Sequence, residues 1–361
     1  MSEFTQDQYW MQRAIELARL GQYSTKPNPN VGCVIVKQGQ LIGEGYHPKA
    51  GQPHAEVFAL RQAGDNAKDA TAYVTLEPCA HYGRTPPCAE ALVKAQVKKV
   101  VLACFDPNPL VAGKGIKILQ DAGIEVATDV CTESAAALNF GFLKAMSTDL
   151  PYVRLKIASS LDGRTAMASG ESKWITGTVA RQDVQHWRAI SGAVITGIQT
   201  VLADDCELNV RALNGIDLAA VVQPKRIVLD RQGQLPLSAK ILKNPETVMV
   251  MTPFRQELAD LGVIQLAPQP LSQLLQILTQ QYQIYDVLVE AGATLSTAFL
   301  QQGLVDEMIS YVAPTLLGQS ARAMFNAEFS EMAEQLRFEL VDVTQLGQDI
   351  RLRLLPTQEM I

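Results

Sequence analysis

The chain has 361 residues, of which 47% are hydrophobic and 19% are charged, and its formal net charge is −6. This composition is typical of a soluble globular protein and excludes a chain that is largely disordered. At this length two domains are expected. The acidic balance and the lack of a run of Lys or Arg argue against binding to a polynucleotide backbone, but not to a small phosphorylated molecule.

The N-terminal sequence MSEFTQDQYW has neither the basic region nor the apolar run of a secretory signal, and no apolar run in the chain is long enough to span a membrane. We therefore expect a cytoplasmic protein with no membrane partner. Its six cysteines are too sparse for a disulfide framework, so cysteines that cluster are expected to bind a metal or take part in catalysis. Only Cys79 and Cys88 lie close together beside histidines.

The first part of the chain alternates between helical and strand patterns. It predicts, in order, a helix at 7–20, a hairpin at 32–46 that turns near Gln38 and Gly39, a helix at 54–63, a strand at 72–76, a helix after Pro87, a strand at 98–103, and helices near 114–122 and 132–145. Such alternation indicates an α/β fold whose sheet is covered by helices on both faces.

The segment MSTDLP at 146–151 interrupts the helical pattern, and the strand-like run YVRLKIA follows it. We place a domain boundary there, with one domain at 1–146 and a second at 151–361. The second domain is predicted to contain helices near 178–190, 271–281 and 295–302 and strands at 192–196, 226–230, 247–251 and 286–290. Strands at 306–314, 338–346 and 349–355 predict that its α/β sheet ends in an antiparallel portion.

His54, Cys79 and Cys88 form the chemically most informative cluster of the sequence. One imidazole and two thiolates suit Zn²⁺, and three protein ligands leave the fourth tetrahedral position for water, as in catalytic zinc sites. Glu56 lies two residues from the histidine and can face that water without binding the metal. Because zinc lowers the pKa of its water to about 7, a carboxylate there can take the proton. The cluster therefore predicts hydrolytic removal of an amino group from a heterocyclic base or from a similar amidine-like carbon.

The spacing of these residues matches the first half of the H-x-E and P-C-x-x-C signature of zinc nucleobase deaminases. The second half differs, because eight residues, AHYGRTPP, separate the two cysteines. Each cysteine follows a proline, and we expect both to begin helices, whose N-terminal N–H groups favour a thiolate. Two alternatives stay open: a structural zinc closed by His47, His81 or Cys33 as the fourth ligand, or no metal at all.

The segments HAE, LEPCAHYGRTPPC, NPNVGCVIV and DPNPLVAGKG make residues 5–145 resemble the deaminase half of the bifunctional riboflavin-biosynthesis deaminase/reductases. The segments KIASSLDGRTAMASGESKWITG, TVLADDCELNVR and VEAGATLSTAFL resemble the reductase half. The resemblance implies a cytidine-deaminase-like α/β/α domain followed by a dihydrofolate-reductase-like α/β domain. It further implies deamination of 2,5-diamino-6-ribosylamino-4(3H)-pyrimidinone 5′-phosphate at ring carbon 2, and then reduction of its ribosyl group by NADPH.

Within the deaminase half, the resemblance makes His54, Cys79 and Cys88 the zinc ligands and Glu56 the catalytic acid and base. It also suggests substrate contacts from Asn28, His47, His81 and Arg84. Asn28 stands between two prolines, so a role in stabilising a turn is an alternative for it.

The reductase half has no G-x-G-x-x-G motif, and its own signal is weaker. The run DVLVEAGATLSTAFL predicts a strand, a turn and a helix, and the free N–H groups at that helix start, with the Thr294 hydroxyl, can bind a cofactor phosphate. Many such turns bind nothing. The resemblance supports NADPH contacts by Ala158, Trp174, Thr200, Asp204, Gly292, Ala293, Thr294, Leu295, Ser296, Thr297 and Ala298.

The substrate contacts that the resemblance implies in this half are Lys156, Ser172, Arg188, Leu208, Arg211 and Glu290. The two arginines carry guanidinium forks suited to a ribose phosphate, and Lys156 and Asp204 are candidates for moving protons while the ribose ring opens. Alternatives are that Trp174 is a core residue and that Arg188 lies on a solvated helix face.

Three residues depart from the family pattern. Cys206 stands where a proline is usual, Arg231 where a small hydroxyl residue that contacts the cofactor is usual, and Ala291 where a glycine is usual. Ala291 is tolerable only if its φ stays negative. Two other hypotheses about function, besides the bifunctional enzyme, are a nucleic-acid-editing deaminase and a non-enzymatic binding module held together by zinc. We also expect a homodimer.

Overall fold

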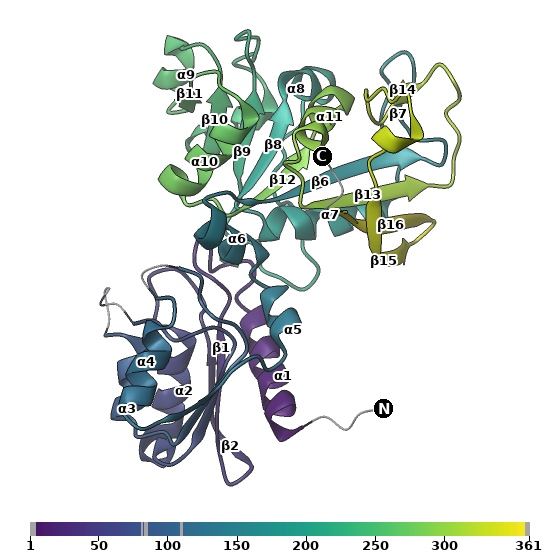
Figure 1. The fold of residues 1–361 in the computed structure, drawn as a ribbon. Helices are drawn as coiled ribbons and strands as arrows, with labels where there is room; N and C mark the ends of the chain where they lie inside the picture. Colours follow the sequence, from purple (N-terminus) through teal and green to yellow (C-terminus); the bar gives the residue numbers. More distant parts are fainter. Residues whose placement is uncertain (1–4, 81, 83–85, 109–110, 358–361) are drawn as a thin grey trace. The chain divides into compact units, whose positions relative to one another are not determined.

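The computed structural model describes residues 5–80, 82, 86–108 and 111–357. The chain divides into two compact units, Met1–Asp149 and Leu150–Ile361, and each is described here by itself. Figure 1 shows the helices and strands of both units. Within the described ranges, no helix combines the length and the apolar character that crossing a membrane requires.

The first unit is built on one mixed five-stranded sheet with the order β2-β1-β3-β4-β5. Its strands are β1 (Gly32–Lys37), β2 (Gln40–Tyr46), β3 (Thr71–Val74), β4 (Lys99–Leu102) and β5 (Glu125–Ala127). β1 pairs antiparallel with β2 and β3, whereas β3, β4 and β5 run parallel. The predicted hairpin turn is confirmed, since Gln38 and Gly39 both have positive φ, 52° and 75°, as a tight two-residue turn requires.

Helices cover both faces of this sheet, which gives the expected α/β/α arrangement. The helices of the first unit are α1 (Gln6–Arg19), α2 (Ala55–Ala63), α3 (Cys88–Lys94), α4 (Lys114–Asp121), α5 (Thr132–Ala136) and α6 (Phe140–Thr148). Buried side chains of α2, α3 and α4 form one core with Ile35 and Val74, and those of α1 and α5 form a second core with Val34 and Tyr73. Alternate residues of each strand thus serve opposite faces.

The single helix predicted near 132–145 is wrong in one respect, because the structure has two helices there. α5 ends at Ala136, and α6 starts after Asn139, whose φ and ψ of −136° and 23° are not helical. The Asn139 side chain instead donates to the carbonyl of Asn30 and accepts from its N–H. A long-range hydrogen-bond pair therefore overrides the local helical pattern, and α6 continues to Thr148 before Asp149 ends it in a left-handed conformation.

The second unit contains a nine-stranded sheet with the order β11-β10-β9-β8-β12-β6-β13-β16-β15. These strands are β6 (Tyr152–Ser160), β8 (Ala193–Gly197), β9 (Lys225–Leu229), β10 (Val248–Met251), β11 (Ile264–Leu266), β12 (Asp286–Glu290), β13 (Glu307–Ala313), β15 (Phe338–Leu346) and β16 (Asp349–Pro356). Neighbouring strands are parallel from β11 to β13, and β16 and β15 add the antiparallel end that the sequence predicts. β7 (Arg164–Ala166) and β14 (Arg322–Ala323) form a separate small ribbon.

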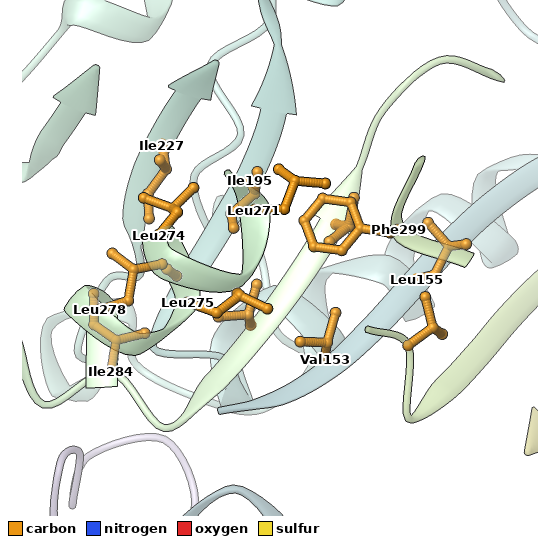
Figure 2. Packing of buried hydrophobic residues seen from close by; sticks show 14 of the residues in the cluster. Val153, Leu155, Ile195, Ile227, Leu271, Leu274, Leu275, Leu278, Ile284 and Phe299 are labelled. Atoms are coloured by element: carbon orange, nitrogen blue, oxygen red, sulfur yellow. The ribbon is translucent and has the colours of Figure 1, made fainter. Parts of the chain in front are cut away.

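The helices of the second unit are α7 (Thr178–Ile190), α8 (Ile198–Asp204), α9 (Gln256–Asp260), α10 (Leu271–Tyr282) and α11 (Ala293–Gln301). One core packs α10 and α11 against the sheet, and Figure 2 shows Leu274 of α10 beside Ile227 of β9. The other core packs α7, α8 and α9 on the opposite face. Both faces being buried explains the nearly continuous apolar runs of the central strands.

Candidate active sites

The ligand atoms of His54, Cys79 and Cys88 lie within 4.8 Å of one another, and theirs is the one such group of metal-binding side chains among the described residues. His54 Nδ1 is 3.6 Å from Cys79 Sγ and 3.4 Å from Cys88 Sγ. A tetrahedral zinc with Zn–N and Zn–S bonds of about 2.0 and 2.3 Å would hold nitrogen and sulfur about 3.5 Å apart. The three side chains therefore fit a zinc ion.

Two of the three ligands are placed by helix starts. His54 is the residue before α2, and Cys88 is the first residue of α3. α2 can approach β2 closely because Gly45 has no side chain: a Cβ there would lie 2.7 Å from the Ala55 carbonyl oxygen. The expectation that Cys79 also begins a helix is wrong, since it lies in the loop after β3. Its sulfur instead accepts the Cys88 N–H at 3.2 Å.

The two thiols differ in acidity. Hydrogen bonds from Cys88 and His54 lower the pKa of Cys79, whereas the hydrogen bond to Cys79, together with burial, raises the pKa of Cys88. Hydrogen bonding to Cys79 also raises the pKa of His54. The triad thus holds a thiolate next to a retained proton, and a dication bound there would displace that proton and be held by both sulfurs.

Glu56 lies in the first turn of α2, and only 3% of its surface is exposed. Its Oε2 has no hydrogen-bond partner among the described residues. Burial, and then the charge of Cys79, raise the pKa of this carboxyl. Burying a carboxylate oxygen without a hydrogen-bond partner costs free energy. The position of Glu56 beside the three ligands therefore fits a catalytic acid and base whose partners are a water molecule and the substrate.

Among the described residues, no fourth side chain joins the triad. His47 cannot close the site in this arrangement, because its Nδ1 lies 3.1 Å from the Pro53 carbonyl oxygen and its Nε2 lies 3.0 Å from Asn28 Nδ2. Cys33 is fully buried on β1, and burial raises its pKa. His81 and Arg84, expected at the rim, lie outside the described residues.

A cleft of about 1820 Å³ opens in the second unit. It lies at the carboxyl ends of the parallel strands β6, β8, β9 and β12, which contribute Ala158, Gly197, Leu229 and Glu290. Ligands bind at this edge in open α/β sheets, and the volume exceeds the range of about 300–1,000 Å³ typical of a pocket for one small molecule. A dinucleotide and a second ligand can therefore share it.

Glu290 is the centre of the charged floor of this cleft. Arg188 holds its carboxylate in a bidentate pair, with Nε–Oε1 and Nη2–Oε2 distances of 2.5 and 2.9 Å, and Lys156 Nζ lies 3.8 Å from Oε2. Burial lowers the pKa of Lys156, while the charges of Arg188 and Lys156 outweigh the burial of Glu290 and lower its pKa. Because Arg188 is only 8% exposed, its placement on a solvated helix face is wrong.

Other predicted residues of this half line the same cleft. They are Trp174, Ser172, Thr200, Asp204, Leu208 and Arg211. Ser172 Oγ donates to Asp204 at 3.1 Å, which links the segment after β7 to the last residue of α8. Trp174 is 69% exposed, so the core alternative for it is wrong. Arg181 stacks over its ring at 4.4 Å from the centroid, a contact for which the sequence held no signal because Trp174 lies outside any periodic helix or strand.

The turn that opens α11 borders the cleft through Gly292, Ala293, Thr294, Leu295 and Ala298. Gly292 caps the helix without a side-chain hydrogen bond, so its first N–H groups remain available. Ser296 and Thr297 are not among the lining residues. They are buried, with Ser296 Oγ donating to the Ala291 carbonyl oxygen and Thr297 Oγ1 accepting the Asn326 N–H.

The structure shows the surroundings of the three residues that depart from the family pattern. Ala291 is not among the residues with positive φ, which meets the condition set by its side chain. Cys206 lines the cleft, packs against the core of α7 and α8, and has its pKa raised to about 11 by burial. Arg231 is exposed in the cleft two residues after β9 ends.

Comparison with known proteins assigns both units. The model of the cytidine and deoxycytidylate deaminase zinc-binding region matches residues 4–104, and that of the RibD C-terminal domain matches residues 151–352. The riboflavin biosynthesis protein RibD of Haemophilus influenzae is 48% identical over 99% of both chains, and that of Escherichia coli is 48% identical over 97% of this chain and 99% of its own. The chain belongs to the RibD family.

Solved RibD structures agree over both units. Acinetobacter baumannii RibD, form 1, is 80% identical and has a TM-score of 0.96 over 98% of this chain and 99% of its own. The Thermotoga maritima deaminase/reductase is 32% identical, with a TM-score of 0.87 over 98% of this chain and 99% of its own. The protein is thus a bifunctional deaminase and reductase of riboflavin biosynthesis that uses zinc and NADPH, as the resemblance implies. The editing-deaminase and zinc-module alternatives are set aside.

Proposed function

We propose that the first unit deaminates 2,5-diamino-6-ribosylamino-4(3H)-pyrimidinone 5′-phosphate at ring carbon 2 and that the second unit reduces the ribosyl group of the product to ribityl. The Thermotoga maritima relative is named a diaminohydroxyphosphoribosylaminopyrimidine deaminase and 5-amino-6-(5-phosphoribosylamino)uracil reductase, which supports this substrate. The observation that carries the deaminase assignment is the buried Glu56 carboxylate beside His54, Cys79 and Cys88, whose Oε2 has no hydrogen-bond partner among the described residues.

In the deaminase, His54, Cys79 and Cys88 would hold the metal. Zinc bound there supplies a water whose pKa falls to about 7 and which is therefore a nucleophile near neutral pH. Glu56 would take a proton from the attacking water as its oxygen bonds to carbon 2, and would pass this proton to the adjacent ring nitrogen. It would then move the remaining proton of the new hydroxyl to the amino group, so that the carbon 2 carbonyl forms as the carbon–nitrogen bond breaks and ammonia leaves. The raised pKa of Glu56 suits it to holding and releasing protons in turn.

Substrate binding by the first unit is assigned to Asn28, whose amide is fixed by His47 and can hydrogen-bond the base. His81 and Arg84 are proposed to contact the base or the phosphate. With its two ring nitrogens engaged by Asn28 and Pro53, His47 acts through Asn28 and is a positioning residue.

In the reductase, NADPH supplies the hydride that reduces carbon 1 of the ribosyl group. The start of α11 is proposed to hold a cofactor phosphate through its free N–H groups and the Thr294 hydroxyl. Ala158, Trp174, Thr200 and Asp204 line the same cleft and are assigned to the cofactor, with Ser296 and Thr297 behind them supporting the helix.

The substrate end of the reductase cleft is assigned to the charged floor. Lys156 is proposed to give a proton to the ribose ring oxygen as the sugar opens, and Asp204 is a second group able to move a proton there. The guanidinium group of Arg188 is already paired with Glu290, so the substrate phosphate is assigned to Arg211, which lines the cleft. Ser172 and Leu208 complete the lining on this side.

The test supplies the diaminopyrimidinone phosphate with NADPH to the full-length protein and follows ammonia and cofactor absorbance separately. Glu56→Gln should keep one zinc per chain and lower ammonia release by about 10²–10⁴-fold. Glu16→Gln, at an exposed position on α1, is the matched control and should behave as wild type. Continued ammonia release by the Glu56 variant would refute the assigned base, and ammonia release without NADPH consumption would confine the proposal to the first unit.

The finer features of location and assembly are proposals too. We place the protein in the cytoplasm because all six cysteines are free and two of them must be thiolates to bind metal, which a reducing compartment preserves. A homodimer stays a prediction, and the mass measured by light scattering after gel filtration tests it.

A further inference from the structure

Glu77 is a buried carboxylate to which the deaminase chemistry gives no task. It stands two residues before Cys79 and is 3% exposed. In the described part of the chain no lysine or arginine forms an ion pair with it. A desolvated carboxylate needs compensation from hydrogen-bond donors when no cation is near.

Backbone N–H groups supply that compensation. Oε1 accepts the N–H groups of Gly115 and Ile116 at 3.0 and 3.3 Å, and Oε2 accepts those of Gly113 and Asp106 at 3.0 and 3.4 Å. Gly115 and Ile116 belong to the first turn of α4, and Gly113, its N-cap residue, has no side chain with which to cap it. Glu77 therefore caps α4 from another part of the chain, where the helix dipole also favours a negative charge.

The same contact bears on the zinc ligand. Pro78, between Glu77 and Cys79, has a fixed φ, so the positions of its two neighbours are closely linked. Its carbonyl oxygen packs against α4 so tightly that a Cβ on Gly115 would lie 2.1 Å from it. On the other side, the Cys79 carbonyl oxygen accepts the Ala89 N–H at 3.2 Å. Cys79 is thus held between the starts of α3 and α4.

This arrangement matters because Cys79 is the one ligand of the three that no helix start carries. His54 and Cys88 are fixed by α2 and α3. We infer that Glu77 is a positioning residue of the deaminase, which sets the place of the Cys79 sulfur relative to the other two ligands by fastening its loop to α4. The inference rests on the proposed zinc site.

The decisive variant is Glu77→Gln in the full-length protein. Each carboxylate oxygen faces two N–H donors, so either orientation of the new amide turns its NH₂ group toward two of them. Gly115→Ala displaces the same loop by placing a Cβ against the Pro78 carbonyl oxygen. Leu119→Ala is the matched control, because it removes a fully buried side chain from α4 without touching the contact.

Two readouts separate positioning from plain stability. The first is the release of zinc to a chelator, and the second is the visible spectrum of the Co²⁺-substituted protein, which reports the geometry of a Cys₂His site. Glu77→Gln and Gly115→Ala should weaken zinc binding by about 10–100-fold and shift the Co²⁺ bands. Leu119→Ala should lower the melting temperature with bands as in wild type. NADPH oxidation by the second unit, supplied with deaminated substrate, should stay unchanged throughout.

A Glu77→Gln protein that melts like Leu119→Ala but keeps the wild-type spectrum and zinc release would overturn the inference and leave Glu77 a simple helix cap. If Glu77→Gln does not fold, Glu77→Asp, which keeps the charge on a shorter stem, and Gly115→Ala decide by the same two readouts. Failure of the zinc site itself looks different: the wild-type protein would then bind no zinc, or His54→Ala would bind it as well as wild type.

Discussion

Asn28 and His47 fix each other beside the zinc triad, with Asn28 Nδ2 lying 3.0 Å from His47 Nε2. The other ring nitrogen, Nδ1, lies 3.1 Å from the Pro53 carbonyl oxygen, which can only accept, so Nδ1 carries the hydrogen. Nε2 therefore accepts from the Asn28 amide, and burial, which lowers the pKa of His47, keeps the ring neutral. The Asn28 carbonyl oxygen is left in one orientation, suited to a donor group of the base.

We expect His47→Ala to lower kcat/KM for deamination by about 10–100-fold, which corresponds to about 1.4–2.7 kcal/mol of transition-state stabilisation. The reason is that the Asn28 amide loses the partner that orients it. Ammonia release measures the effect, zinc content should remain at the wild-type level, and NADPH oxidation with deaminated substrate serves as the internal control. Unchanged deamination would mean that Asn28 needs no fixed orientation.

Glu290→Gln should move the alkaline limb of the reductase pH profile to lower pH. Lys156 must be protonated to act as an acid, burial already lowers its pKa, and Glu290 is the charge that raises it. Without that charge, Arg188 repels Lys156 unopposed, so the pKa falls further and activity is lost at lower pH. The same variant leaves Arg188 buried and unpaired, which should cost about 3–5 kcal/mol of stability.

The pH dependence of kcat/KM for NADPH oxidation measures this shift. Lys156→Arg is the comparison, because a guanidinium keeps the positive charge but does not release its proton, so reductase activity should fall at every pH. An alkaline limb that stays in place in Glu290→Gln would show that another group donates the proton.

The sequence predicted the grouping of His54, Cys79 and Cys88, which the structure brings together, because its signal is local. His54 and Glu56 share one helix turn, and the identity of His, Glu and Cys limits the chemistry to few possibilities. Cys79 shows the limit: the proline before it suggested a helix start, whereas the sulfur is placed by contacts with the starts of α3 and α4, which are remote in sequence. The break between α5 and α6 was not predicted for the same reason, because the Asn30–Asn139 pair that causes it joins segments 109 residues apart.

In the reductase the sequence predicted the alternation of strands and helices, but it did not predict which contacts the individual side chains make. The sequence around Arg188 is compatible with a solvated side chain, with a phosphate-binding one and with an ion-paired one. Only the packing of α7 against β12 brings Glu290 to Arg188. Trp174 likewise is apolar by composition yet lies in the open cleft under Arg181. Pairings between distant segments decide such roles, and periodicity carries no information about them.

We expect Arg231 to contribute to the preference of the reductase for NADPH over NADH. It lines the cleft, and it has no ion-pair partner in the described part of the chain. An unpaired guanidinium in a dinucleotide cleft suits the 2′-phosphate that distinguishes NADPH from NADH. We expect Arg231→Ala to raise KM for NADPH about tenfold, in line with the loss of one charge-assisted hydrogen bond, with little effect on KM for NADH.

Initial rates with each cofactor, and calorimetric titration with 2′,5′-ADP against 5′-AMP, measure this preference. Arg231→Ser, which introduces the small hydroxyl residue typical of the family, should recover part of the NADPH preference. An equal loss with both cofactors would place Arg231 at a phosphate that they share.

His186 should make the second unit sensitive to mild acid. Burial lowers its pKa from 6.5 to about 4, with Arg154, Arg351 and Arg353 opposing and Asp183 favouring its charged form. Above pH 6.5 neither the folded nor the unfolded state holds the proton, so His186 costs nothing. As the pH falls from 6.5 towards 4 the unfolded state takes the proton first, and the folded state loses up to about 3 kcal/mol relative to it.

Urea unfolding of the second unit at pH 7.5, 6 and 5 measures that loss. His186→Gln carries no titrating group, so its stability should fall less than that of the wild type over the same interval, and the difference between the two slopes isolates the histidine from the carboxylates that titrate at lower pH. Parallel slopes for the two proteins would mean that the imidazole takes up its proton equally in the folded and unfolded states, against the burial of its ring beside Trp187.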